Sequence, residues 1–183
     1  LHLADAGDDL FGRLVGAQDR LVTHQHAGDV GVPAGALDQG LDLAIVFDST
    51  GSMQGLLDHV KANMTEITRS MTRLIPSFRL AMITYRDTNP FGPVTYLVRK
   101  VDFSPSPFRS LIWLDSVGAS GGSGEHAAVC LGLDAAVDEI AWRPEAARVV
   151  LLIGDAPPHS HRLRHIQKAV ERFAAQGGTI HCL

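Results

Sequence analysis

The amino-acid sequence predicts an α/β domain with a doubly wound, mostly parallel central sheet and helices on both of its faces. Short, mainly apolar runs such as Leu41–Phe47 and Val149–Ile153 are typical of strands that are buried on both faces of a sheet. Between them lie longer segments whose apolar residues recur every three or four positions, as on one face of a helix. The 183 residues, 45% of them hydrophobic and 20% charged, are enough to bury a single core.

Residues 1–40 differ from the rest and are expected to be an N-terminal extension or linker. They are rich in glycine and poor in large apolar residues. Their clearest apolar pattern is a short helical stripe made of Leu10, Phe11, Leu14 and Val15. From Gly28 to Gly40 the composition is that of a linker. The folded domain is therefore expected over residues 41–183.

The domain begins with a predicted strand, a long helix and a second strand. Leu41–Phe47 is the first strand, and Arg79–Tyr85 is the second. The helix between them has one apolar face, made of Met53, Leu56, Leu57, Val60, Met64, Ile67, Met71 and Leu74. This spacing is that of an amphipathic helix which packs on the sheet.

The middle of the chain predicts an edge strand followed by helices. Val94–Val101 carries basic residues and follows prolines, so we place it at an edge of the sheet. Pro105–Val117 holds a short helix. Ala127–Ile140 is a longer, alanine-rich helix that should be largely buried.

The last segment predicts two strands with a helix between them. Val149–Ile153 is expected to be a fully buried strand, with Thr179–Leu183 paired in parallel beside it. The helix has an apolar face made of Leu163, Ile166, Val170 and Phe173, and glycines end it. A doubly wound domain would continue with a further helix. We therefore expect a C-terminal element to be missing after Leu183, which leaves one side of the sheet thinly covered.

Charge, hydropathy and cysteine content narrow the classes of function. Lys and Arg number 16 against 20 Asp and Glu, and the formal net charge of −4 argues against nucleic-acid binding, which needs a basic surface. No apolar run approaches the roughly 20 residues that a membrane-spanning helix needs. Cys130 and Cys182 are expected to be small buried hydrophobes, and they favour a reducing compartment such as the cytoplasm. Because the chain opens with Leu1, secretion through an upstream signal peptide stays open.

Candidate functional residues follow the first and fourth strands. Asp48 comes directly after the first, and Asp155 follows the fourth after one glycine. If these strands are neighbours, both carboxylates face one crevice at the carboxyl end of the sheet, where such sheets bind ligands. Thr50 and Ser52 add hydroxyl oxygens, and this set of hard ligands suits Mg²⁺ or Mn²⁺. The alternative is structural, since Ser and Thr before a helix are preferred N-caps.

Separated motifs resemble those of the von Willebrand factor type A domain. Leu43–Met53, with Asp-Ser-Thr-Gly-Ser at positions 48–52, resembles the first strand and metal loop of that family. Leu151–His159 resembles its last metal motif, and Tyr85–Asp87 is similar to a subgroup that accompanies an atypical alpha-kinase in some members. The resemblance covers about residues 41–183. It implies a metal-ion-dependent adhesion site in which Asp48 and Asp155 are ligands together with the hydroxyls of Thr50 and Ser52.

The family takes a further ligand from a middle loop, where this sequence departs from the pattern. Subgroup members typically read Gly-Gly-Gly-Asp-x-Pro-Glu, whereas residues 121–127 read Gly-Gly-Ser-Gly-Glu-His-Ala. The aspartate of the family falls on Gly124. Ser123 is the nearest oxygen donor and the expected ligand, and Glu125 is the other candidate.

The resemblance implies a binding module rather than an enzyme. The site would hold Mg²⁺, or else Mn²⁺ or Ca²⁺, and leave one position open for a Glu or Asp carboxylate of a protein partner. The alternative is a metal-dependent hydrolase or phosphatase, for which Asp48, Asp155 and a metal are the minimum parts. No general base is evident for it, and the phosphate-binding loop and the Gly-x-Ser-x-Gly nucleophile motif are absent.

Weaker patterns lie near the same motifs. His159, His161 and His165 could bind Zn²⁺ as neutral imidazoles, although exposed histidines at the start of a basic helix are more often solvated. Arg86 and Asp87 are expected either to line the crevice or to pair with each other.

Overall fold

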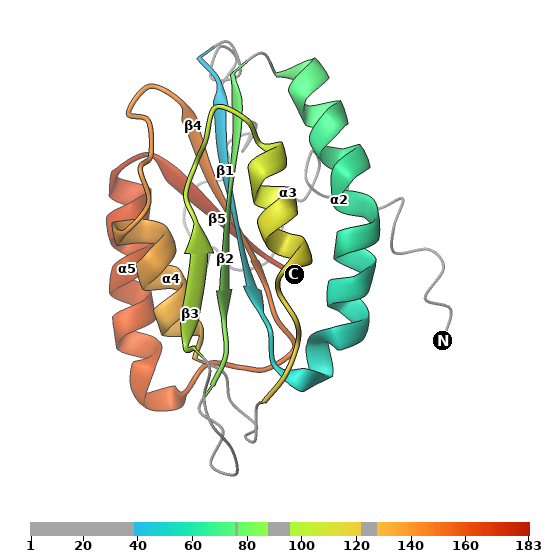
Figure 1. Cartoon of the computed structure of the whole chain (residues 1–183). Coiled ribbons are helices and arrows are strands. Elements are labelled where there is room, and N and C mark those ends of the chain that lie inside the picture. Colours follow the sequence, from blue (N-terminus) through green and yellow to red (C-terminus); the bar gives the residue numbers. More distant parts are fainter. Residues whose placement is uncertain (1–38, 76, 88–95, 122–127) are drawn as a thin grey trace.

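The computed structural model describes residues 39–75, 77–87, 96–121 and 128–183 (Figure 1). The strands in this part of the chain are β1 (Leu41–Asp48), β2 (Phe78–Tyr85), β3 (Val98–Val101), β4 (Ala147–Ile153) and β5 (Gly178–Cys182). The α-helices are α2 (Gln54–Leu74), α3 (Phe108–Asp115), α4 (Val129–Asp138) and α5 (Leu163–Ala175). Short 3₁₀ helices precede α2 and α5, namely η2 (Gly51–Met53) and η3 (Ser160–Arg162).

β1 lies at the centre of the sheet, whose strand order is β3-β2-β1-β4-β5. It pairs in parallel with β2 on one side and with β4 on the other, so that Phe47 lies opposite both Thr84 and Ile153. β5 extends the sheet in parallel beside β4, and β3 pairs antiparallel with β2 at the other edge. The order of the strands therefore reverses between β1 and β4.

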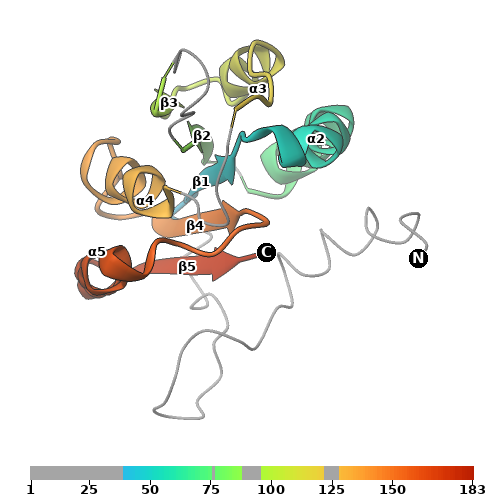
Figure 2. The same cartoon turned by 90° about the horizontal axis from the view of Figure 1, so that it is seen from below.

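Helices lie on both sides of the sheet. α2 and α3 lie on one side, and α4 and α5 lie on the other (Figure 2). Alternate residues of β1 enter different cores, because successive side chains of a strand point to opposite faces. Leu43 and Ile45 pack with residues of α2, whereas Ala44 and Val46 pack with residues of α4. The protein is thus a mixed α/β fold with a mostly parallel central sheet, compatible with a Rossmann-like architecture.

Within the described residues, the structure confirms the predicted mixed α/β fold with a mostly parallel sheet, and it confirms the predicted order of elements. The long helix after β1 is present as α2, and β3 lies at an edge of the sheet. β5 pairs in parallel beside β4, as the sequence predicts. α4 is largely buried. None of the helices in this part of the chain is long and apolar enough to cross a membrane.

Burial near β5 differs from the prediction. β4 is not fully buried, since Val149 and Leu152 are only half-buried. The reason is that β4 lies beside β5, an edge strand whose own residues are half-buried or exposed. Cys182 on β5 is exposed for the same reason and is not the buried hydrophobe that we expected, whereas Cys130 is buried.

Some predicted segments differ in extent or lie outside the described part of the chain. β3 begins at Val98, and α4 spans Val129–Asp138, so both are shorter than the predicted segments. Residues 94, 95 and 127, which belong to those segments, lie outside the described residues. The same is true of residues 1–38, which include the predicted linker and its apolar stripe.

Candidate metal-binding site

Asp48 and Asp155 lie at the carboxyl ends of neighbouring strands. Asp48 ends β1, and Asp155 follows β4 after Gly154. Because Phe47 pairs with Ile153, the two strands end at the same level of the sheet. α2 then packs on one side and α5 on the other (Figure 2). Parallel α/β sheets bind ligands at the carboxyl ends of their strands, at the point where the order of the strands reverses. In this sheet that point lies between β1 and β4.

The carboxylate of Asp48 is buried and only partly satisfied. The residue is 1% exposed, and its Oδ1 accepts a hydrogen bond of 2.7 Å from the backbone N–H of Thr50. Its Oδ2 has no hydrogen-bond partner among the described residues. Burial raises the pKa of the Asp48 carboxyl, and the negative charges of Asp155 and Asp87 raise it further. A cation beside Oδ2 would supply the missing partner and offset the cost of burying the charge.

Thr50 and Ser52 bring hydroxyl oxygens to the same loop. Thr50 Oγ1 lies 3.4 Å from Ser52 Oγ, and Ser52 is exposed. Thr50 is the N-cap residue of η2, but its side chain makes no capping hydrogen bond. Instead, the Thr50 side chain hydrogen-bonds to the Asp48 carboxylate, and this bond partly offsets the rise in the pKa of Asp48. The capping role considered from the sequence is therefore not seen for Thr50.

Gly154 allows the end of β4 to lie close to Tyr85 and Asp48. A Cβ atom at this position would lie 2.8 Å from the hydroxyl oxygen of Tyr85 and 3.7 Å from Asp48 Cβ. Tyr85 is 1% exposed, so its ring has little room to move away. Burial raises the pKa of Tyr85, and the charges of Asp48 and Asp155 contribute to the rise. The phenol therefore stays neutral beside the two carboxylates.

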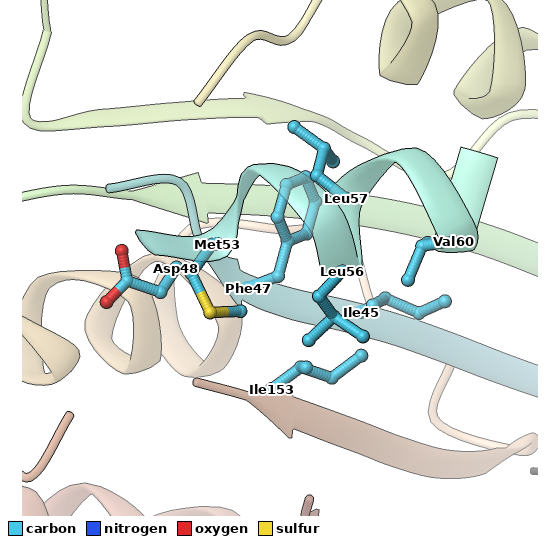
Figure 3. Close-up of a pocket in the computed structure, with 8 residues that line it drawn as sticks. All are labelled: Ile45, Phe47, Asp48, Met53, Leu56, Leu57, Val60 and Ile153. Carbon is cyan, nitrogen blue, oxygen red and sulfur yellow. The ribbon is translucent and has the colours of Figure 1, made fainter. Parts of the chain in front are cut away.

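An apolar groove adjoins Asp48 (Figure 3). Its other lining residues are all apolar, namely Ile45, Phe47, Met53, Leu56, Leu57, Val60 and Ile153. The carboxylate of Asp48 lies at one end of this group and points away from the apolar side chains (Figure 3). These apolar neighbours explain why burial has the largest effect on the pKa of Asp48.

Arg86 and Asp87, which follow β2, both make contacts near the site. Asp87 Oδ2 lies 2.9 Å from His159 Nε2, in the segment that follows β4. The charge of Asp87 also contributes to the raised pKa of Asp48. Arg86 donates hydrogen bonds to Ser49 and to other residues around the loop. The end of β2 is thus connected to the ends of both β1 and β4.

The histidines considered as zinc ligands have different neighbours. His159 pairs with Asp87, and His165 Nε2 lies 2.8 Å from both carboxylate oxygens of Asp134 on α4. The rings of His159 and His161 lie 5.4 Å apart. Within the described ranges, no group of three or more His, Cys, Asp or Glu side chains is placed to hold a metal ion. Within the described residues, the structure therefore does not bring the three histidines together as zinc ligands. This finding does not bear on a site made of two carboxylates and hydroxyls, because such a site contains fewer than three His, Cys, Asp or Glu side chains.

Ser123, the expected ligand from the middle loop, lies outside the described residues, as do Gly124 and Glu125. The described chain before them ends at Gly121, whose carbonyl oxygen accepts a hydrogen bond of 2.9 Å from the backbone N–H of Gly51. The segment that leads into the middle loop is thus bonded to the loop that follows Asp48.

The sequence interpretation did not single out several residues that surround the site, namely Ser49, Tyr96, Ser120 and Gly154. Gly154 could have been identified from the sequence, because a glycine between a buried strand and a candidate ligand suggests a close approach of the backbone to a neighbouring residue. The contacts of Tyr96 and Ser120 join positions that are far apart in the sequence. No local pattern reveals such contacts.

Comparison with known proteins gives a partial match. No family model matches the chain. A stretch of 122 residues, which is 65% of this chain, is 29% identical to part of the alpha-protein kinase vwkA of Dictyostelium discoideum. The match covers 19% of that protein, so the chain spans only a small part of this relative's length. Fold and comparison together define a mixed α/β domain that is similar to one segment of a much longer protein.

Proposed function

We propose that this chain is a von Willebrand factor type A-like module that binds a protein partner through a divalent metal ion. The observation that carries the proposal is Asp48 Oδ2, which is buried without a hydrogen-bond partner in the described part of the chain. It lies at the end of the central strand, beside the strand that leads to Asp155. Carboxylates combined with hydroxyls are the hard oxygen ligands that Mg²⁺ prefers.

The donor set explains why a partner would be needed. Asp48, Thr50 and Ser52 would hold Mg²⁺, or Mn²⁺ or Ca²⁺, directly or through water, with Asp155 and Ser123 completing the site. The hydroxyls are neutral, and a carboxylate that binds through water offsets less of the ion's charge than one that binds directly, so the ion still attracts a further carboxylate. A Glu or Asp carboxylate of a partner protein offsets that charge at the open position. Binding then requires both the metal and the carboxylate.

The relative and the motifs support the same proposal. The motifs around Asp48 and Asp155 resemble those of type A domains, which accompany an atypical kinase in some members of the subgroup. The Dictyostelium relative is itself named as an alpha-protein kinase. Because the match covers 19% of that protein, we propose a binding role and no kinase activity for this chain.

Thermal unfolding with and without Mg²⁺ tests the proposal. A ligand that binds only the folded state at a hundred times its Kd stabilises by about 2.7 kcal/mol. For a domain of this size, that raises Tm by about 5–10 °C. Asp48→Asn should remove the increase. Asp58→Asn is the matched control, because Asp58 is an exposed carboxylate on α2 that bonds to Gln54. No shift in the wild type, or an equal shift in Asp48→Asn, would refute the metal site.

Activity measurements separate the binding module from the hydrolase alternative. Phosphatase and esterase substrates should give no turnover at saturating Mg²⁺. Turnover that requires Mg²⁺ and is lost in Asp48→Asn would favour the hydrolase instead.

A further inference from the structure

Arg86 is a buried cation just after β2 whose donors reach separate segments of the chain. It is 5% exposed. Its Nε lies 3.3 Å from Ser49 Oγ, and its Nη1 lies 2.8 Å from Ser120 Oγ. Its Nη2 lies 2.5 Å from Tyr96 Oη and 2.7 Å from the carbonyl oxygen of Gly118. The guanidinium also stacks on Tyr96, with Cζ 3.9 Å from the ring centroid. One side chain thus connects the loop after β1, the segment before β3 and the segment after α3.

Ser49 is the residue of the Asp48–Ser52 loop that faces Arg86. Its Oγ lies 3.1 Å from Tyr96 Oη. Its carbonyl oxygen accepts a hydrogen bond of 3.0 Å from the backbone N–H of Ser120. Ser49 therefore lies between the proposed ligands Asp48 and Thr50 in the chain, and its contacts hold the loop against Arg86, Tyr96 and Ser120. A movement of segment 118–121 would be transmitted directly to the backbone of the loop.

We propose that Arg86 is a positioning residue for the metal site, which holds the Asp48–Ser52 loop against segment 118–121. The hydroxyls of Thr50 and Ser52 are then kept at their spacing before a metal arrives. This inference rests on the proposed function. A guanidinium suits the task because its planar fork presents several donors in fixed directions, whereas the ammonium of lysine is a point charge. Residues that orient metal ligands without touching the ion contribute about 10–100-fold in metal affinity.

Arg86→Lys tests the role because it keeps the charge and loses the fork. Titration calorimetry should show Mg²⁺ binding weakened about 10-fold or more. In the metal-free protein, amide hydrogen exchange should become faster at Gly51 and Ser120, whose N–H groups bond across the two segments. Arg143→Lys is the matched control, because the Arg143 guanidinium bonds to Asp42 at the opposite end of β1. It should lower global stability and leave both the Mg²⁺ affinity and these amides unchanged.

Tyr96→Phe is a milder variant, since it keeps the stacked ring and removes the hydroxyl that accepts from Arg86. It should also weaken Mg²⁺ binding, by a smaller factor, and it decides the question if Arg86→Lys does not fold.

If the wild type binds Mg²⁺ and the variants bind it equally well, the positioning role is overturned. If the wild type binds no Mg²⁺, the proposed function fails, and amide exchange alone decides the role of Arg86. Exchange at Gly51 and Ser120 no faster in Arg86→Lys than in Arg143→Lys would then overturn it.

Discussion

Asp42 and Asp48 lie near opposite ends of β1, both are buried, and the pKa values of their carboxyl groups are shifted in opposite directions. Burial raises the pKa of Asp42, but hydrogen bonds from Arg79 and Arg143 outweigh this effect and hold the pKa below its ordinary value. Asp48 accepts a backbone hydrogen bond from Thr50 on Oδ1 and none on Oδ2 within the described residues. On the same strand, hydrogen bonds and ion pairs therefore offset the cost of burying the Asp42 carboxylate, but they offset only part of that cost for Asp48.

Asp48→Asn should stabilise the metal-free protein at neutral pH by about 1–3 kcal/mol, because a neutral amide replaces a partly unsatisfied buried charge. The raised pKa gives the sign of the pH dependence. The contribution of Asp48 to stability is fully present below its ordinary pKa of 3.8 and is lost as pH rises through the raised value. Urea unfolding in EDTA should thus show the advantage of the variant shrinking on acidification. A variant less stable than the wild type at neutral pH would contradict this account.

Asp42→Asn should destabilise the protein by about 3–5 kcal/mol, because it breaks a buried ion pair and leaves guanidinium groups without a charged partner. The pKa of Asp42 is lowered, so its contribution is present above 3.8 and is lost as pH falls through the lowered value. Chemical unfolding at neutral pH and near pH 3 measures both effects. Asp138→Asn is the control, because its ion pair with Arg172 is exposed and is expected to contribute about 0–1 kcal/mol. Equal costs in the two variants would argue against the ion-pair explanation.

Gly154→Ala should cost about 1–3 kcal/mol through overpacking against the buried Tyr85 hydroxyl. It should also weaken Mg²⁺ binding, because the displaced strand end carries Asp155. Gly55→Ala makes a good comparison, since nothing lies within 4 Å of a Cβ atom at that helical position. There the substitution should stabilise by about 0.5–1 kcal/mol. Calorimetric titration and thermal unfolding of both variants check this, and a harmless Gly154→Ala would show that the approach to Tyr85 is not required.

Gly124→Asp should tighten Mg²⁺ binding, because it returns a carboxylate to the middle-loop position that the type A family uses. Ser123→Ala should loosen binding modestly, because it removes a neutral donor. Isothermal titration of the two variants against the wild type measures both changes. Unchanged affinity in both would mean that this loop does not contact the metal.

The fold was predictable because its determinants are local. Runs such as Leu41–Phe47 and Val149–Ile153 identify strands, and the spacing of apolar residues identifies the helices between them. The prediction that Asp48 and Asp155 share one end of the sheet needed only that their strands be neighbours, and β1 and β4 are paired. The burial of β4 was overestimated, because the composition of a strand does not show how thinly the strand beside it is covered.

The contacts of Arg86 were not predictable in the same way. Its partners Ser49 and Ser120 lie 37 and 34 residues away in the sequence. Such contacts depend on the assembled sheet and on the courses of several loops, and they leave no periodicity in the chain. The sequence could mark Arg86 as a candidate near the crevice but could not tell which segments it joins.

The central position of β1 also determines when the site is assembled. Leu41 pairs with Phe78 of the next strand but also with Ala147, far along the chain. A nascent polypeptide emerges from its N-terminal end, and closing the longer loop costs more chain entropy. β1 and β2 can therefore pair on the ribosome while Asp155 is still unsynthesised. Under the proposed function, a nascent chain acquires its complete metal site only when β4 docks, so that metal occupancy would report this late step of folding.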